Sequence, residues 1–370
     1  MHGALWVFSI FQASFRCASC PAFPHCKFSP AFLTLIKAEN IRPNTSGDGF
    51  DRVLCCVVMV WIFLCPLQVI LLMLSYGTVV PLILVGIYVW IRQKTPALFL
   101  SGFLMFFFSA VGPATGNFDL IFFISMLPYF QAQLFQYSAR IQLCRTADDA
   151  LAALSAGRCG AFLSIEGAES ISCDPGLLDE AWAQGIRMIT LTWNYRNALA
   201  GSCHTGEGLS AQGREFARRA QKLGIILDVS HLSDRAFWDL CEISEKPIVS
   251  SHSNSRAVCA NPRNLTDEQF QAICRLGGTA GLNLYSLFLS DRPATFEDIY
   301  RHLDHFLSLG GDGHVALGGD LDGCDELPAG FASLDSYSAL WRFLEGKGYS
   351  EKALTSLFSG ALLDVLRKCQ

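Results

Sequence analysis

Four side chains that can bind a metal ion or move a proton each stand at or just after the end of a short apolar run. They are Glu166, His231, His252 and Asp320. Imidazole nitrogens and carboxylate oxygens are the ligands that zinc uses where it keeps an open position for water. One histidine taken alone is more often a structural residue, but four such positions in succession favour a shared function. We therefore predict a divalent metal site, provided that the fold brings the ends of these runs together.

The elements that must position these residues alternate between apolar strands and amphipathic helices. We predict strands over residues 160–165, 186–192, 224–229, 247–251, 278–284 and 314–318. We predict helices over residues 147–156, 210–222, 234–244, 266–276 and 295–309. This alternation is typical of a parallel sheet, and without a glycine-rich nucleotide-binding motif it favours a β/α barrel over a doubly wound sheet. The carboxyl ends of barrel strands meet on one face, where all four side chains would lie.

Charge divides the chain near residue 145. The 370 residues carry a formal net charge of −5 at pH 7 and are 51% hydrophobic. Residues 1–145 have a net charge of +5, whereas residues 146–370 have a net charge of −10. The acidic overall balance excludes a generally basic nucleic-acid-binding protein, so we expect no nucleic-acid partner.

Residues 53–139 have the character of membrane-spanning helices. The run from 53 to 91 holds 39 residues without a charge, and further uncharged runs cover 95–118 and 120–139. A helical span needs about 20 apolar residues, and its backbone must satisfy its hydrogen bonds internally. We predict two spans within 53–91, a third near 97–112 and a weaker fourth near 119–131, which places the protein in a membrane with lipid as a partner. Alternatively, these residues are buried helices that pack onto the open side of the barrel. Residues 1–52 are predicted to be irregular.

Five segments of the acidic part resemble the membrane dipeptidase (renal dipeptidase) family of zinc peptidases. The segments are LSIEGAES (163–170), LTWNYRN (191–197), GIILDVSHLSDRAFWDL (224–240), PIVSSHSNSRAVCANPRNLTDE (247–268) and ALGGDLDG (316–323). The resemblance covers about residues 145–370 and implies an amidohydrolase-like (β/α)8 barrel that hydrolyses dipeptides with two zinc ions. It therefore implies the same fold class as the strand pattern, a metallo-dependent hydrolase barrel.

The resemblance also implies a role for each matching residue. Glu166 matches the carboxylate that bridges the two metal ions, and His231 and His252 match the remaining ligands of one of them. Arg263 matches the arginine that binds the substrate carboxylate. Asp320 matches the acid that acts on the bridging water and on the substrate.

The sequence departs from the family in the segment that should supply the other metal site. Members of the family begin with a strand that ends in His-x-Asp, but the only His-x-Asp here is His302-Leu303-Asp304, which lies in an amphipathic helical pattern. By this count residues 145–370 supply strands three to eight of an incomplete barrel, and the hydrophobic region stands where the first two belong. We therefore expect one zinc ion rather than two. A second departure is Trp193, which replaces a histidine found in some members.

Three hypotheses about function remain open. The first is a membrane-tethered, zinc-dependent dipeptidase that uses a metal-activated water. The second is a catalytically impaired barrel remnant, a pseudoenzyme that binds or scaffolds. The third is a fused or misassembled reading frame, in which a foreign membrane segment has replaced the true N-terminal strands. A homodimer is left open, and the sequence does not identify the preferred dipeptides.

Overall fold

The computed structural model describes residues 127, 130–132, 134–321 and 323–370 of the chain. The irregular segment predicted over 1–52 lies outside the described residues, as do nearly all of the hydrophobic region 53–139 and its predicted spans. Among the residues that are described, no helix is both long enough and apolar enough to cross a membrane.

Eight strands and ten helices have defined bounds in the described part of the chain. The strands are β1 (Ile141–Leu143), β2 (Cys159–Ala161), β3 (Leu163–Glu166), β4 (Ile186–Thr190), β5 (Ile226–Asp228), β6 (Ile248–Ser250), β7 (Thr279–Asn283) and β8 (Val315–Gly319). The helices are α7 (Ala147–Ser155), α8 (Leu178–Gln184), α9 (Ala211–Leu223), α10 (Asp234–Ile243), α11 (Asp267–Arg275), α12 (Ser286–Leu289), α13 (Phe296–Ser308), α14 (Ser336–Gly346), α15 (Glu351–Thr355) and α16 (Ala361–Cys369). Short helical turns at Ala168–Ile171, Pro175–Leu177 and Ser356–Gly360 complete these elements.

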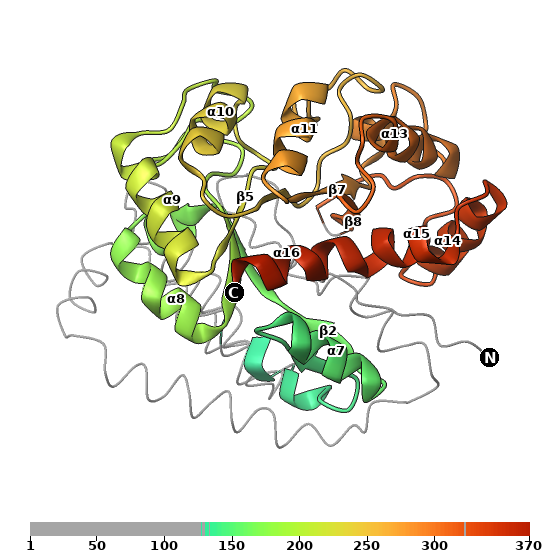
Figure 1. Ribbon diagram of the computed structural model, residues 1–370, viewed down its shortest axis with the longest axis horizontal. Helices are drawn as coiled ribbons and strands as arrows, with labels where there is room; N and C mark the ends of the chain where they lie inside the picture. Colours follow the sequence, from blue (N-terminus) through green and yellow to red (C-terminus); the bar gives the residue numbers. More distant parts are fainter. Residues whose placement is uncertain (1–126, 128–129, 133, 322) are drawn as a thin grey trace, which may run out of the picture. The chain divides into compact units, whose positions relative to one another are not determined.

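Strands β3 to β8 form one parallel sheet in which every strand pairs with the next strand along the chain. The sheet curls, and helices α8 to α14 form an arc around it (Figure 1). Parallel neighbours need a crossover between them, and the helices supply it. The prediction of an incomplete β/α barrel with strands three to eight is therefore confirmed, and all six strands lie where the sequence placed them, to within a few residues.

The two faces of this sheet are covered by different helices, because successive side chains of a strand point to opposite sides. On one face, Ile189, Leu227 and Ile248 belong to a core that includes apolar residues of helices α9, α10, α11 and α13. Within that core the rings of Phe270 and Phe306 stack at a centroid distance of 4.0 Å. The other, inner face carries a second apolar cluster, which joins the sheet to α7 and α16. Its members include Phe162, Met188, Ile226, Val249, Leu363 and Leu366.

Strands β1 and β2 form a separate parallel pair beside the curled sheet. Strand β2 runs on through Phe162 into β3, whereas β1 is a three-residue strand that the apolar pattern did not predict. Helix α7 connects the two and begins with a capping box, in which Thr146 and Asp149 satisfy each other's backbone N–H groups.

His302 lies inside helix α13, as its amphipathic pattern predicted. Its ring is buried, accepts a hydrogen bond from the backbone N of Ser255 at 3.0 Å and donates one to the carbonyl of Leu289 at 3.0 Å. Both ring nitrogens therefore hold the chain in place, and the His-x-Asp of this sequence is a structural element rather than the end of a strand.

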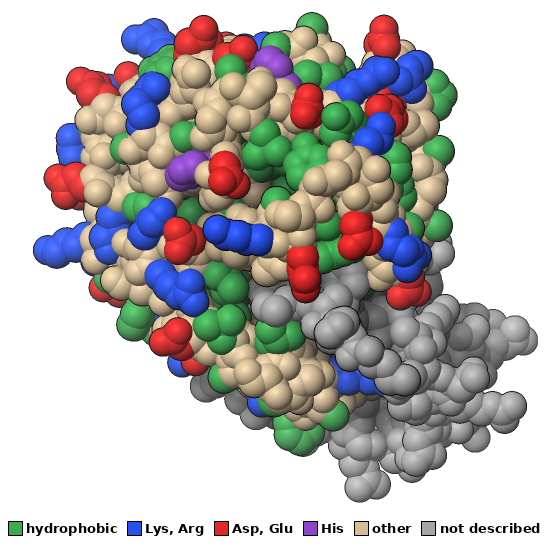
Figure 2. Space-filling model, turned by 45° about the vertical axis from the view of Figure 1, so that its right-hand side comes forward, with side chains coloured by type: hydrophobic (Ala, Val, Ile, Leu, Met, Phe, Trp, Pro, Cys, Tyr) green, Lys and Arg blue, Asp and Glu red, His purple; other side chains and the backbone are tan. Residues whose placement is uncertain are grey.

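Among the described residues on the face shown in Figure 2, acidic and basic side chains are interspersed, and neither sign forms a continuous field.

Candidate metal centre

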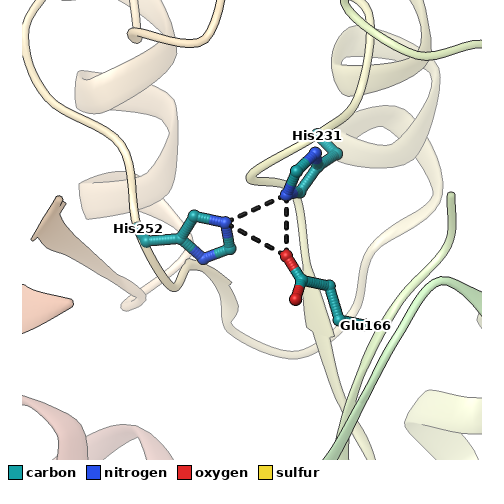
Figure 3. Close-up of side chains that lie close together, drawn as sticks. All are labelled: Glu166, His231 and His252. Atoms are coloured by element: carbon teal, nitrogen blue, oxygen red, sulfur yellow. Dashed lines mark hydrogen bonds and ion pairs between the residues drawn. The ribbon is translucent and has the colours of Figure 1, made fainter. Parts of the chain in front are cut away.

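Three of the predicted residues meet at one point at the carboxyl ends of the strands. Glu166 is the last residue of β3, His231 follows β5 and His252 follows β6. Figure 3 shows the carboxylate and the two imidazole rings directed at one another. His231 Nε2 lies 2.8 Å from Glu166 Oε1 and 3.0 Å from His252 Nε2, and His252 Nε2 lies 3.4 Å from Glu166 Oε1. These three side chains therefore lie together, as the positions of the strand ends predicted.

Burial and neighbouring groups together set the protonation of this cluster. Burial, together with the positive charge of Arg263, lowers the pKa of His231 to about 3, so its ring is neutral at physiological pH. Burial opposes ionisation of Glu166 as well, but the contacts of Oε1 with the rings of His231 and His252 hold the pKa of its carboxyl well below the usual range. For His252 burial is outweighed by Asp320 and Glu166, whose negative charges raise its pKa. The site therefore combines an ionised carboxylate with a neutral imidazole, both in the form that binds metal.

The orientation of His231 is fixed by a residue that the sequence analysis did not single out. Its Nδ1 lies 3.1 Å from Oδ1 of Asn194, in the loop after β4. An amide oxygen only accepts hydrogen bonds, so Nδ1 carries the proton and Nε2 presents its lone pair to the cluster. Metal-binding histidines are generally held by such an acceptor on the other nitrogen. In the sequence, the role of Asn194 was indicated only by its position in the LTWNYRN segment.

Arg263 lies in the loop between β6 and α11 and reaches the same cluster. The residue is 6% exposed, and its Nη2 lies 3.2 Å from His231 Nε2. The guanidinium also lies 5.5 Å from the centroid of the Phe288 ring. Its Nη1 is buried and has no hydrogen-bond partner among the described residues. A buried donor without a partner is costly, so this nitrogen is suited to an anionic ligand that enters the site.

Asp320 follows β8 and completes the set of predicted residues around the cluster. Its Oδ2 accepts a hydrogen bond from Asn283 Nδ2 at 3.1 Å. Burial raises the pKa of its carboxyl, helped by the negative charge of Glu166 and opposed by the charge of His252. Its backbone φ is 61°, in the left-handed region, directly after Gly319 at 71°. The side chain is therefore a partly buried carboxylate of increased basicity, close enough for its charge to act on His252.

The donor set fits a divalent metal ion of the zinc type. The carboxylate and the two imidazoles offer ligand atoms that all lie within 4.8 Å of one another, and this is the one such cluster in the described part of the chain. Zinc binds nitrogen and oxygen at about 2.0–2.2 Å, and three protein ligands leave one of its four positions open. These three side chains would hold such an ion, and the guanidinium of Arg263 lies next to them.

Comparisons with known proteins agree with this site and fold. The family model described as membrane dipeptidase (peptidase family M19) matches residues 119–370. An uncharacterized protein of Klebsiella pneumoniae is 35% identical over 251 residues, which are 64% of this chain and 92% of that protein. An uncharacterized dipeptidase of Schizosaccharomyces pombe is 31% identical over 64% of this chain, and the chain spans 59% of its length.

A solved structure shows the same arrangement of elements. It is a metallopeptidase of Rhodobacter sphaeroides, determined with a phosphinate mimic of the dipeptide L-Ala-D-Ala, and it is 30% identical with a TM-score of 0.64. The likeness covers 67% of this chain and 74% of that one. Because the family model covers more than half of the 370 residues, the chain belongs to the membrane dipeptidase family, peptidase family M19.

Proposed function

We propose that this protein is a zinc-dependent dipeptidase, which hydrolyses the peptide bond of dipeptides with a metal-activated water. The observation that carries the proposal is the meeting of Glu166, His231 and His252 beside the unpaired guanidinium nitrogen of Arg263. Membership of the family supports a peptidase that depends on a metal. Zinc is proposed because two imidazoles and a carboxylate with an open fourth position are typical of its catalytic sites.

Glu166, His231 and His252 would hold the metal ion. When bound, the ion supplies Lewis acidity, which polarises the scissile carbonyl and lowers the pKa of a water molecule. We propose one ion rather than two, because the only His-x-Asp of the sequence lies in helix α13. The lone pair of His231 is kept available by Asn194, and its ring stays neutral.

Asp320 would act as the general base and then as the general acid. Burial raises the pKa of its carboxyl, which makes the carboxylate a better proton acceptor than an exposed aspartate. It would take the proton of the attacking water and deliver it to the leaving amine. Asn283 holds one carboxylate oxygen in place, which leaves the other for this transfer.

Arg263 would bind the free carboxylate of the substrate. Its planar guanidinium can form two parallel hydrogen bonds to a carboxylate, and Nη1 has no other partner among the described residues. This pair would place the C-terminal end of the peptide about one residue from the metal. Cleavage would therefore be confined to very short peptides, with dipeptides as the proposed substrates.

The second candidate function is that of a catalytically impaired remnant of the barrel. The observation in its favour is again the position of the His-x-Asp in a helix, since the ligands of the other metal are then missing from the sequence. A misassembled reading frame would produce the same departure. The membrane location, with lipid around residues 53–139, is proposed from the uncharged runs alone, and a homodimer stays a prediction.

The decisive experiment uses the full chain, purified, depleted of metal and reloaded with zinc. We expect about one zinc ion per chain and slow hydrolysis of Ala-Ala that stops when the metal is chelated. Ala-Ala amide is the matched control substrate, because it keeps the peptide bond but lacks the carboxylate for Arg263. Zinc binding without any hydrolysis would favour the impaired remnant, and equal cleavage of the amide would contradict the role of Arg263.

A further inference from the structure

A fully buried carboxylate, Asp228, is connected to the metal centre through one serine side chain. Asp228 is the last residue of β5, is 1% exposed, and faces the interior on the same side as Ile226. Five donors surround its two oxygens. Oδ1 accepts from the backbone N of Ser230 (3.1 Å), the hydroxyl of Ser230 (2.7 Å) and the backbone N of Ser251 (2.8 Å). Oδ2 accepts from the hydroxyls of Thr190 and Ser251, each at 2.7 Å.

One of these donors links Asp228 to a metal ligand. The hydroxyl of Ser251 lies 2.7 Å from Asp228 Oδ2 and 2.6 Å from His252 Nδ1. A serine hydroxyl has a single proton, and the ionised carboxylate is the strongest acceptor in its reach. The hydroxyl therefore donates to Asp228 and must accept from the ring, which places the ring proton on Nδ1.

The hydroxyl of Ser230 cannot take over this role. It accepts from the backbone N of His252 at 3.0 Å and lies 2.7 Å from Oδ1 of Asp228, to which it donates its own proton. Ser230 thus contacts the backbone of His252, whereas Ser251 contacts its ring. Both depend on the same carboxylate.

We propose that Asp228 is a positioning residue of the metal centre, which acts through Ser251 to keep the proton of His252 on Nδ1, so that its Nε2 lone pair faces Glu166 and His231. Metal-binding histidines are usually oriented by a direct acceptor, and here the serine hydroxyl is interposed between ring and carboxylate. The inference rests on the metal site of the proposed function. It does not depend on whether the chain cleaves dipeptides.

A purely structural role for Asp228 makes a different prediction. By accepting from Thr190, Ser230 and Ser251 it also ties together the ends of β4, β5 and β6. If Asp228 only held these strand ends together, removing any one of its donors would lower the stability of the fold by a similar amount and leave the metal affinity unchanged. Thr190 is the matched control, because it donates to the same Oδ2 but has no link to His252.

The consequences of Asp228→Asn follow from the donors around each oxygen. The backbone N–H groups of Ser230 and Ser251 cannot rotate away, so the new amide nitrogen must take the position of Oδ2, where both partners are hydroxyls. Ser251 would then accept from the amide and donate to His252 Nδ1. The ring proton would move to Nε2, and the lone pair needed by the metal would be lost.

The experiment compares Asp228→Asn, Ser251→Ala, Ser251→Thr and Thr190→Val in the full chain by zinc titration against a chelator. We expect Asp228→Asn and Ser251→Ala to weaken zinc binding by about 10–100-fold, as loss of such outer partners does. Ser251→Thr keeps the hydroxyl and should rescue the affinity. Thr190→Val should lower the melting temperature but change the affinity by less than about threefold.

A second measurement needs no metal. The ¹⁵N spectrum of the His252 ring, recorded in alkaline solution where the imidazole is neutral, should show the Nδ1–H tautomer in the parent chain. The Nε2–H form should appear in Asp228→Asn and Ser251→Ala. If Asp228→Asn fails to fold, the comparison of Ser251→Ala with Ser251→Thr still tests the proposal. Unchanged tautomer and affinity in Ser251→Ala, or an equal loss in Thr190→Val, would overturn the proposal. Zinc binding without dipeptide hydrolysis would instead contradict only the proposed function.

Discussion

On the inner face of the sheet, the side chains of each central strand change from apolar to polar within two residues. Towards the amino ends its side chains are apolar and pack against α7 and α16. Two positions further along the chain, on the same side of each strand, the side chains are polar and hydrogen-bonded to one another. The paired positions are Met188 and Thr190 at β4, Ile226 and Asp228 at β5, and Val249 and Ser251 at β6.

The apolar side chains that pack the interior and the polar side chains that surround the metal ligands therefore occupy separate layers of one half-barrel. Barrel interiors are filled in layers, and the layer nearest the carboxyl ends borders the functional face. Here the apolar layer should determine stability, whereas the polar layer should determine how the metal ligands are held. Substitutions in the apolar layer should therefore leave zinc affinity nearly unchanged, whereas substitutions at the metal ligands and beside them should change metal binding or turnover.

The largest effect is expected for Asp320→Asn above the polar layer. The amide keeps the shape of the side chain but cannot accept the proton of the attacking water. We expect kcat for dipeptide hydrolysis to fall by about 10²–10⁴-fold, while zinc binding stays close to that of the parent chain. Steady-state kinetics together with metal analysis of the same preparation would test this, and undiminished turnover would remove Asp320 from the mechanism.

His252→Ala should abolish most metal binding. It leaves Glu166 and His231 as the only two protein ligands, so the loss of zinc affinity should exceed the roughly 100-fold change typical of an outer partner. Equilibrium dialysis with zinc analysis gives the result directly. His302→Ala is the control, since it removes a buried histidine with two hydrogen bonds inside α13 and should lower stability without changing the amount of zinc bound.

Ile226→Ala tests the apolar layer. Ile226 is 1% exposed and belongs to the cluster with α7 and α16, so truncation should leave a cavity. We expect the free energy of unfolding to fall by about 2–4 kcal/mol, measured by urea denaturation, with little change in zinc affinity. A large loss of zinc binding in a variant that is still folded would show that the two layers are not separable.

The smallest effect concerns pH. The negative charges of Asp320 and Glu166 outweigh burial and raise the pKa of His252, whereas the pKa of His231 is about 3. Because a ligand must lose its proton to bind metal, zinc affinity should fall as the pH drops through the raised pKa of His252, by about tenfold per pH unit below it. Zinc titration across the acidic range should show the loss of one proton, and a two-proton dependence would mean that His231 also titrates.

The convergence of the site could be predicted from the sequence because it follows from topology. Once parallel strands were recognised, Glu166, His231 and His252 had to lie on one face, wherever the exact strand ends fell. Roles that depend on tertiary distances could not be predicted in this way. Nothing in the local pattern distinguishes Ser251, which contacts the ring of His252, from Ser250, which lies beside it in the sequence.

The same limit applies to elements that are defined by their partners. Strand β1 has three residues, too few for an alternation to be recognised, and it exists because β2 pairs with it. Helix α16 is amphipathic, but periodicity shows only that one side is buried and not that it covers the inner face of the sheet.

The backbone at Asp320 has a consequence for which substitutions this position tolerates. A left-handed conformation at a residue with a Cβ costs on the order of 1 kcal/mol, whereas glycine adopts it freely. Mutation to glycine at this position would relieve the backbone, and in a chain whose hydrolysis no longer mattered such a change would be free to accumulate. The left-handed backbone directly after β8 therefore favours glycine, and the carboxylate of Asp320 is carried there at a small cost in stability.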